Sequence, residues 1–169
     1  FTGTGNVFLN ENKGVTTFDA RSLNAGDTFS VDDDTATSDV TVLIGKANFN
    51  MVASFSSDKY TVSTDAALGA TQNISTVGAR TADDTVNING ASVHTIATGD
   101  GTDTINFNAG SGLTNADSVD GGVGTDTLKV SDVLAATDLN GVRNVEVFNL
   151  TAGGSTITPA DAVLAAGAS

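Results

Sequence analysis

Two segments of the chain repeat one pattern of glycine and aspartate, 23 residues apart. They are TGDGTDTINF, residues 98–107, and GGVGTDTLKV, residues 121–130. In the alignment Asp103 meets Asp126 and Ile105 meets Leu128, and the glycines coincide in two pairs, Gly99 with Gly122 and Gly101 with Gly124. Two glycine-rich turns, each followed by aspartate and a β-type run in the same register, predict successive coils of a solenoid.

The rest of the chain also has the pattern of short strands and turns that is typical of an all-β protein. Short runs with alternating apolar and polar residues, such as residues 49–55, are separated by clusters of Gly, Asn, Asp and Ser. The sequence therefore predicts a parallel β-helix, or β-solenoid. Two departures are expected as well. Asn89-Gly90 could close an antiparallel hairpin, and Thr158-Pro159 predicts a short C-terminal helix over residues 162–166.

We expect one β-solenoid domain over residues 1–169. Its first part, residues 1–70, is richer in Phe, and residues 78–151 hold the clearer repeats. Because the chain begins with Phe1 instead of Met, we expect it to be a fragment of a longer protein.

The charge of the chain narrows its partners. The net charge is −13, and 18 of the 20 acidic residues are Asp, which is short, suits turns and can bind a cation close to the backbone. The seven Lys and Arg residues are spread along the chain, so the sequence shows no basic patch of the kind that binds nucleic acid. No apolar run is long enough for membrane insertion. The absence of Cys excludes a disulfide scaffold and a thiolate zinc site.

The two repeats predict a calcium site. Asp103 and Asp126 would supply carboxylates, and glycine-rich backbone frees carbonyl oxygens to complete the shell. The backbone candidates are Gly99, Gly101, Gly122 and Gly124. Further acidic candidates are Asp100 and Asp120 near the same turns, Asp83 and Asp84 in a degenerate repeat, and Asp32 and Asp34 in an acidic cluster. Ordinary Asp-Gly turns and a solvated acidic loop are the alternatives.

The motif GGVGTDTL resembles the Gly-Gly-x-Gly-x-Asp-x-(apolar)-x unit of repeats-in-toxin proteins, and the copy at Gly99 lacks only the first glycine. In that family six residues form a calcium-binding turn and three form a short parallel strand. Residues 15–23, 26–31 and 142–151 are similar to the repetitive body of bacterial surface-layer proteins and of large type I-secreted adhesins.

This resemblance implies a structural role outside the cell, at the bacterial cell surface. The chain is expected to be a segment of a surface layer that calcium folds and that self-assembles into a lattice or filament. The alternative is a ligand-binding module of a secreted adhesin, with a cell-surface polysaccharide as its partner. The scarcity of Trp and Tyr weakens the case for a sugar-binding platform.

An enzyme is not expected. The chain has no Gly-x-Ser-x-Gly elbow, Walker loop, EF-hand or zincin motif. His94 is its only histidine, and the residue order alone leaves a Ser/His/Asp triad open. We expect His94 to be structural or to lie on the surface.

Overall fold

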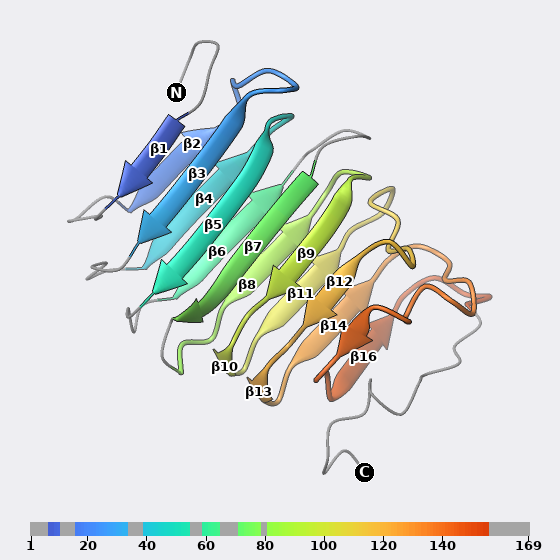
Figure 1. Ribbon diagram of the computed structural model, residues 1–169. Coiled ribbons are helices and arrows are strands. Elements are labelled where there is room, and N and C mark those ends of the chain that lie inside the picture. Colours follow the sequence, from blue (N-terminus) through green and yellow to red (C-terminus); the bar gives the residue numbers. More distant parts are fainter. Residues whose placement is uncertain are drawn as a thin grey trace.

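The computed structural model describes residues 7–10, 16–33, 39–54, 59–64, 71–78 and 81–155. This part of the chain contains sixteen β-strands and no helix, so it has no helix that is long and apolar enough to cross a membrane. Fourteen of these strands form two seven-stranded sheets that face each other, and the chain alternates between the sheets as it advances along the stack (Figure 1). The protein is a parallel β-solenoid, as the sequence predicts.

The two large sheets have simple strand orders. Sheet I consists, in spatial order, of β1 (Val7–Asn10), β3 (Thr28–Asp33), β5 (Asn48–Ser54), β7 (Thr71–Gly78), β9 (Val93–Ala97), β12 (Ser118–Asp120) and β15 (Val142–Arg143). Sheet II consists of β2 (Thr17–Ala20), β4 (Val40–Ile44), β6 (Tyr60–Thr64), β8 (Thr85–Ile88), β11 (Thr104–Phe107), β14 (Thr127–Val130) and β16 (Val147–Leu150). Both sheets continue without a break across the region around residue 70.

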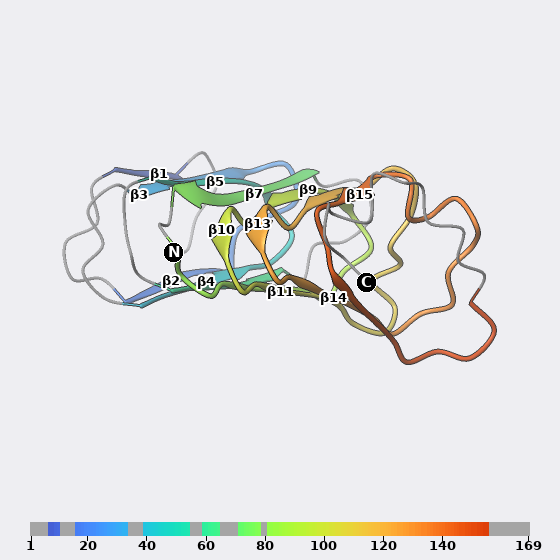
Figure 2. The same cartoon turned by 90° about the horizontal axis from the view of Figure 1, so that it is seen from below.

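Two very short strands form a third, two-stranded sheet. They are β10 (Asp100–Gly101) and β13 (Val123–Gly124), which belong to the two glycine-rich turns. Figure 2 shows the two large sheets as two layers, with β10 and β13 standing between them. These turns carry the chain from sheet I to sheet II.

Every strand pairing among the described residues is parallel. The predicted antiparallel hairpin at Asn89-Gly90 is therefore wrong. β8 pairs with β6 and β11, whereas β9 pairs with β7 and β12. The N–H of Asn89 donates to the carbonyl oxygen of Thr64 at 2.9 Å, which continues the ladder to the preceding coil. The turn thus leads from one sheet to the other.

The core lies between the two sheets and follows from the alternation in each strand. In β4, for example, Val40, Val42 and Ile44 are buried while the residues between them are partly exposed. Successive side chains of a strand point to opposite faces, so alternate residues fill the interior. The rings of Phe29 and Phe49 stack there at 5.7 Å between centroids. Complete burial of each large apolar side chain contributes about 1.5–3 kcal/mol.

Coil length varies, whereas the strand register is kept in every pairing among the described residues except that of β5 with β7, where it shifts between Val52 and Ser54. Hydrogen bonds between equivalent positions of neighbouring coils span 24, 19, 23 and 20 residues in succession. The offset of 23 residues between the two glycine repeats is therefore one of several coil lengths, and the loops absorb the difference. The predicted helix over residues 162–166 lies outside the described residues.

Candidate functional site

The two glycine-rich turns stack directly on each other, in the register that the sequence predicts. Gly101 pairs with Gly124, and the N–H of Val123 donates to the carbonyl oxygen of Gly99 at 2.8 Å. A Cβ on Gly124 would overlap the carbonyl oxygen of Gly101. Gly101 and Gly124 also have φ of 152° and 150°, which side chains disfavour. Glycine at these positions therefore allows the two coils to approach each other.

Four acidic residues follow one another in successive coils, and we call them the acid column: Asp84, Asp103, Asp126 and Glu146. The Oδ1 atom of Asp84 accepts the backbone N–H of Tyr60 at 2.8 Å. The Oδ1 atom of Asp103 accepts the N–H of Asp84 at 2.7 Å, and that of Asp126 accepts the N–H of Asp103 at 2.8 Å. The column ends where Oε2 of Glu146 accepts the N–H of Asp126 at 2.8 Å. Each carboxylate thus links its own coil to the preceding one.

The three aspartates of the column occupy positions that belong to the core. Val40 pairs with Tyr60 at the equivalent position of the earlier coils, and both are buried. Asp84, Asp103 and Asp126 are only 1%, 0% and 0% exposed. The solenoid therefore changes from an apolar to an acidic interior at one column, and the change begins at Asp84.

One oxygen of each aspartate in the column has no hydrogen-bond partner among the residues that the structure describes. The Oδ2 atoms of Asp84, Asp103 and Asp126 are buried and unpaired. The hydroxyls of Thr76 and Thr98 lie near Asp84 and Asp103. However, they donate their hydrogens to the carbonyl oxygens of Thr98, at 2.9 Å, and of Gly121, at 2.7 Å. A buried carboxylate oxygen without a partner is costly while the group is charged.

Burial shifts the titration of all three aspartates toward neutral pH. Burial raises the pKa of Asp84 to about 7, although hydrogen bonds to its carboxylate act in the opposite direction. It raises the pKa of Asp126 to about 6, and the nearby charges of Asp103 and Glu146 also raise it. Burial likewise raises the pKa of Asp103. The column therefore favours neutralisation, either by protons or by a bound cation.

The chemistry of the column fits calcium, which takes six to eight oxygen ligands. The unpaired Oδ2 atoms are hard anionic donors. Oδ2 of Asp126 and the carbonyl oxygen of Asn144 also border the space beside Gly121 that a Cβ would fill. Among the described residues no group of three or more His, Asp or Glu side chains converges as a metal site. An ion in the column would therefore combine single carboxylates with backbone carbonyls.

Other predicted ligands lie near the column but have different contacts. Oδ1 of Asp83 accepts the N–H of Thr102 at 2.9 Å, and Asp100 is exposed in β10. These side chains surround the turns without entering the interior. Their negative charge is nevertheless close enough to raise the pKa of Asp103.

Asp120 is engaged by two side chains of the next coil. Its Oδ2 accepts from Nε of Arg143 at 2.9 Å and its Oδ1 from Nδ2 of Asn144 at 2.7 Å. Its carboxylate oxygens therefore already bind cationic and polar groups.

The acidic cluster expected at residues 32–34 is not described in full. Asp32 lies in β3, where its backbone pairs with Val52, and Asp34 lies outside the described residues.

Glu146, the last member of the column, was not among the predicted ligands. Glu146 lies within a run, residues 145–150, that reads as a strand, and it has no glycine repeat before it. The available signal was its position directly before β16, which matches the position of Asp126 before β14. The hydroxyls of Thr76 and Thr98 were not predicted either. Thr76 lies in β7 and Thr98 directly follows β9, so only the passage of the chain from sheet I to sheet II brings them near Asp84 and Asp103.

His94 belongs to a buried hydrogen-bonded chain. Its Nε2 lies 2.9 Å from Oγ of Ser92, and its Nδ1 lies 3.0 Å from Oδ1 of Asp117. The order Ser–His–Asp resembles that of a hydrolytic triad. However, His94 is 0% exposed and its ring packs edge-on against Phe107, so a substrate has no access to it. Burial would raise the pKa of Asp117, but hydrogen bonds from His94 and Thr114 outweigh it and lower the pKa.

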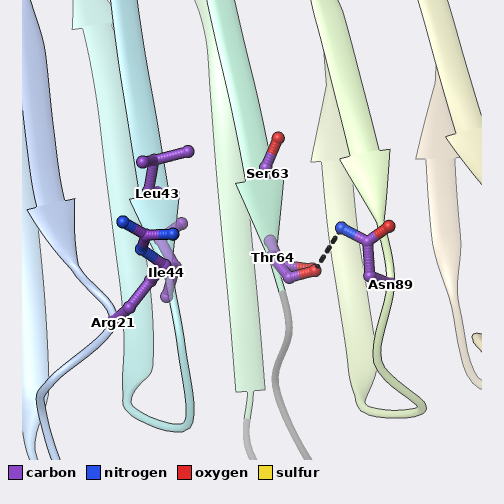
Figure 3. Close-up of a pocket in the computed structure, with 6 residues that line it drawn as sticks. All are labelled: Arg21, Leu43, Ile44, Ser63, Thr64 and Asn89. Carbon is purple, nitrogen blue, oxygen red and sulfur yellow. Dashed lines mark hydrogen bonds between the residues drawn. The ribbon is translucent and has the colours of Figure 1, made fainter.

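A shallow hollow of about 290 Å³ lies at the ends of β4, β6 and β8. Figure 3 shows the side chains that line it, which are Arg21, Leu43, Ile44, Ser63, Thr64 and Asn89. Nδ2 of Asn89 donates to the carbonyl oxygen of Thr64 at 3.0 Å across it. Among the described residues the lining has no aromatic ring and no acid, and it contains none of the predicted metal ligands.

Comparisons with known proteins give no relative for this chain. No protein-family model, no curated protein and no solved structure matches it.

Proposed function

We propose that this chain is a structural β-solenoid module of a bacterial surface layer, folded outside the cell by calcium that binds along the acid column. The observation that carries the proposal is the set of three buried aspartates, each with an unpaired Oδ2. Two of the three, Asp103 and Asp126, are the acids of the glycine repeats that resemble calcium-binding turns. The surface location and the self-assembly rest on that resemblance.

Calcium could control folding because the column is unfavourable without a counter-charge. Extracellular calcium modules have dissociation constants of about 10⁻⁴–10⁻³ M. A site at 100 times its dissociation constant adds about 2.7 kcal/mol of stability. Since a whole domain has a net stability of about 5–15 kcal/mol, two or three such sites would decide whether the chain is folded.

The test compares thermal unfolding of the wild type and Asp103→Asn, followed by far-UV circular dichroism in EGTA, in calcium and in magnesium. Asparagine keeps an oxygen for the N–H of Asp84 but removes the buried charge. We expect the variant to melt no lower than the wild type in EGTA, and clearly below it in calcium. Asp138→Asn is the control, because the carboxylate of Asp138 accepts the N–H of Ala135 in an exposed turn and is not part of the acid column.

Two outcomes would contradict the calcium proposal. In one, the wild type has the same spectrum and melting temperature in EGTA as in calcium. In the other, magnesium stabilises it as much as calcium does, which would indicate general screening of a chain with net charge −13.

The second candidate function is that of a ligand-binding module within a secreted adhesin. The hollow at the ends of β4, β6 and β8 is the observation that favours it. A calcium-loaded monomer that binds a neutral cell-surface glycan, and loses that binding with Ser63→Arg, would support this candidate.

A further inference from the structure

Buried polar side chains are confined to one length of the solenoid. Among the described residues, every buried polar or charged side chain lies at Thr64 or later in the chain. We call residues 16–64 the apolar zone and residues 71–150 the polar zone, with Thr64 at the boundary. The two zones are consecutive lengths of one stack, β2 to β6 and β7 to β16 (Figure 1). The buried polar residues are Thr64, Gln72, Thr76, Asp84, Ser92, His94, Thr98, Asp103, Ser111, Asp117 and Asp126.

A second interior column changes its character at the same boundary. The pairing of β5, β7 and β9 places Phe49, Gln72 and His94 in one inward row of sheet I. Phe29 precedes this row and stacks on Phe49, whereas Asp117 follows it and binds His94. All five side chains are buried. The row therefore turns polar at Gln72, in the same passage of the chain in which the acid column begins.

The two zones differ in what their interiors need. Burial of aromatic rings such as Phe29 and Phe49 stabilises a coil without any further ligand. In the polar zone, Oε1 of Gln72 and the Oδ2 atoms of the three aspartates of the acid column are buried with no partner among the described residues. Buried charges and unpaired polar atoms are unfavourable until a counter-charge or a partner is bound. Only the polar zone therefore depends on an ion.

We propose that the solenoid folds in two steps: the apolar zone folds without calcium, and the polar zone folds onto it only when calcium binds along the acid column. The stability of a solenoid is approximately a sum of terms for single coils and for contacts between neighbouring coils, so a partly folded state can exist at equilibrium. The inference rests on the proposed function for the identity of the cation. It adds that calcium controls one length of the chain and not the other.

The hydrogen bonds at the boundary support this order of folding. Oδ1 of Asp84, in the polar zone, accepts the backbone N–H of Tyr60 at 2.8 Å, and Tyr60 is completely buried in the apolar zone. The N–H of Asn89 donates to the carbonyl oxygen of Thr64 at 2.9 Å. A folded apolar zone thus presents ordered backbone groups to the first coil of the polar zone. Fewer residues then have to lose their freedom when that coil forms.

The experiment is hydrogen–deuterium exchange of the full chain, followed by mass spectrometry, in calcium and in EGTA at one fixed pH. Peptides covering β4 report on the apolar zone, where the N–H of Thr41 donates to the carbonyl oxygen of Thr16. Peptides covering β11 and β14 report on the polar zone, where the N–H of Thr127 donates to the carbonyl oxygen of Asp103. Such amides exchange when their hydrogen bonds open, so their protection measures local stability.

We expect the amides of β11 and β14 to exchange at least about tenfold faster in EGTA than in calcium, and those of β4 to change by less than about threefold. Loss of protection in both zones together would overturn the inference, but it would leave calcium-dependent folding intact. Unchanged protection in both zones would overturn the inference and the proposed function together. The two proposals can therefore fail separately.

A matched pair of variants tests whether the zones unfold independently. Val62 and Val86 pair with each other in β6 and β8, and both are 0% exposed, but they lie on opposite sides of the boundary. In EGTA, Val62→Ala should speed the exchange of the β4 amides about tenfold, because two buried methyl groups are lost. Val86→Ala should leave this exchange unchanged, because the polar zone is already unfolded. Equal effects of the two variants on β4 would indicate one cooperative unit and would overturn the inference.

Discussion

The acid column predicts that, without calcium, the protein loses stability as the pH rises from about 5 to about 8. The perturbation is the ionisation of Asp84, Asp103 and Asp126 inside the core. Burial raises the pKa of each of them. Between the unfolded pKa, 3.8, and the folded value the native state binds more protons than the unfolded state, so stability falls with rising pH in this window.

The structure gives the scale of the loss. One pH unit in the window corresponds to about 1.4 kcal/mol per proton. With the pKa of Asp84 at about 7 and that of Asp126 at about 6, the change from about pH 5 to about pH 8 removes about 3 and about 1 kcal/mol, respectively. This is a large fraction of the net stability of about 5–15 kcal/mol that a domain has.

The assay is urea unfolding of the chain in EGTA at several pH values, repeated in saturating calcium. Calcium binds the deprotonated carboxylates, so its affinity rises with pH and the decline in stability should disappear or reverse. Below about pH 4 stability should fall again. The pKa of Asp117 is lowered, so the contribution of this residue is present above the unfolded value and lost as the pH falls through the folded one.

A stability in EGTA that is constant or rises between about pH 5 and pH 8 would refute this reasoning. It would mean that the carboxylates of the column are ionised and solvated in the native state. Asp103→Asn provides an internal check, because removing one charge from the column should make the decline shallower.

Two further predictions concern stability. Gly124→Ala should lower the free energy of unfolding by about 3 kcal/mol or more, because the added Cβ would overlap the carbonyl oxygen of Gly101. Gly153→Ala is the control, because its Cβ would have nothing within 4 Å and should change the calorimetric melting temperature little. Equal effects of the two substitutions would contradict the stacked-turn geometry. Asp117→Ala should lower the free energy of unfolding by about 3–5 kcal/mol in urea, because it leaves the backbone N–H and the Nδ1 atom of His94 without their buried acceptor. A loss below about 1 kcal/mol would show that the hydrogen bonds between His94 and Asp117 do not stabilise the fold.

The amino-acid sequence alone was enough to predict the solenoid and the alignment of its two clearest coils. Alternation within strands and the glycine–aspartate turns are local signals, and parallel in-register stacking repeats them from coil to coil. The pairing of Ile105 with Leu128 follows the sequence alignment. The prediction of a hairpin at Asn89-Gly90 was wrong because a two-residue turn signal does not show whether the next strand returns to the same sheet or crosses to the opposite one.

Other features depend on the tertiary structure. The sequence marks Asp84, Asp103 and Asp126 as acids near turns, but only the packed coils bury them and leave one oxygen of each unpaired. The link between Ser92, His94 and Asp117 likewise joins residues of two coils, 23 positions apart for the last pair. Burial and contacts between coils depend on the number of residues in each coil. Because this number varies from 19 to 24, a single sequence does not show which residues of neighbouring coils will meet.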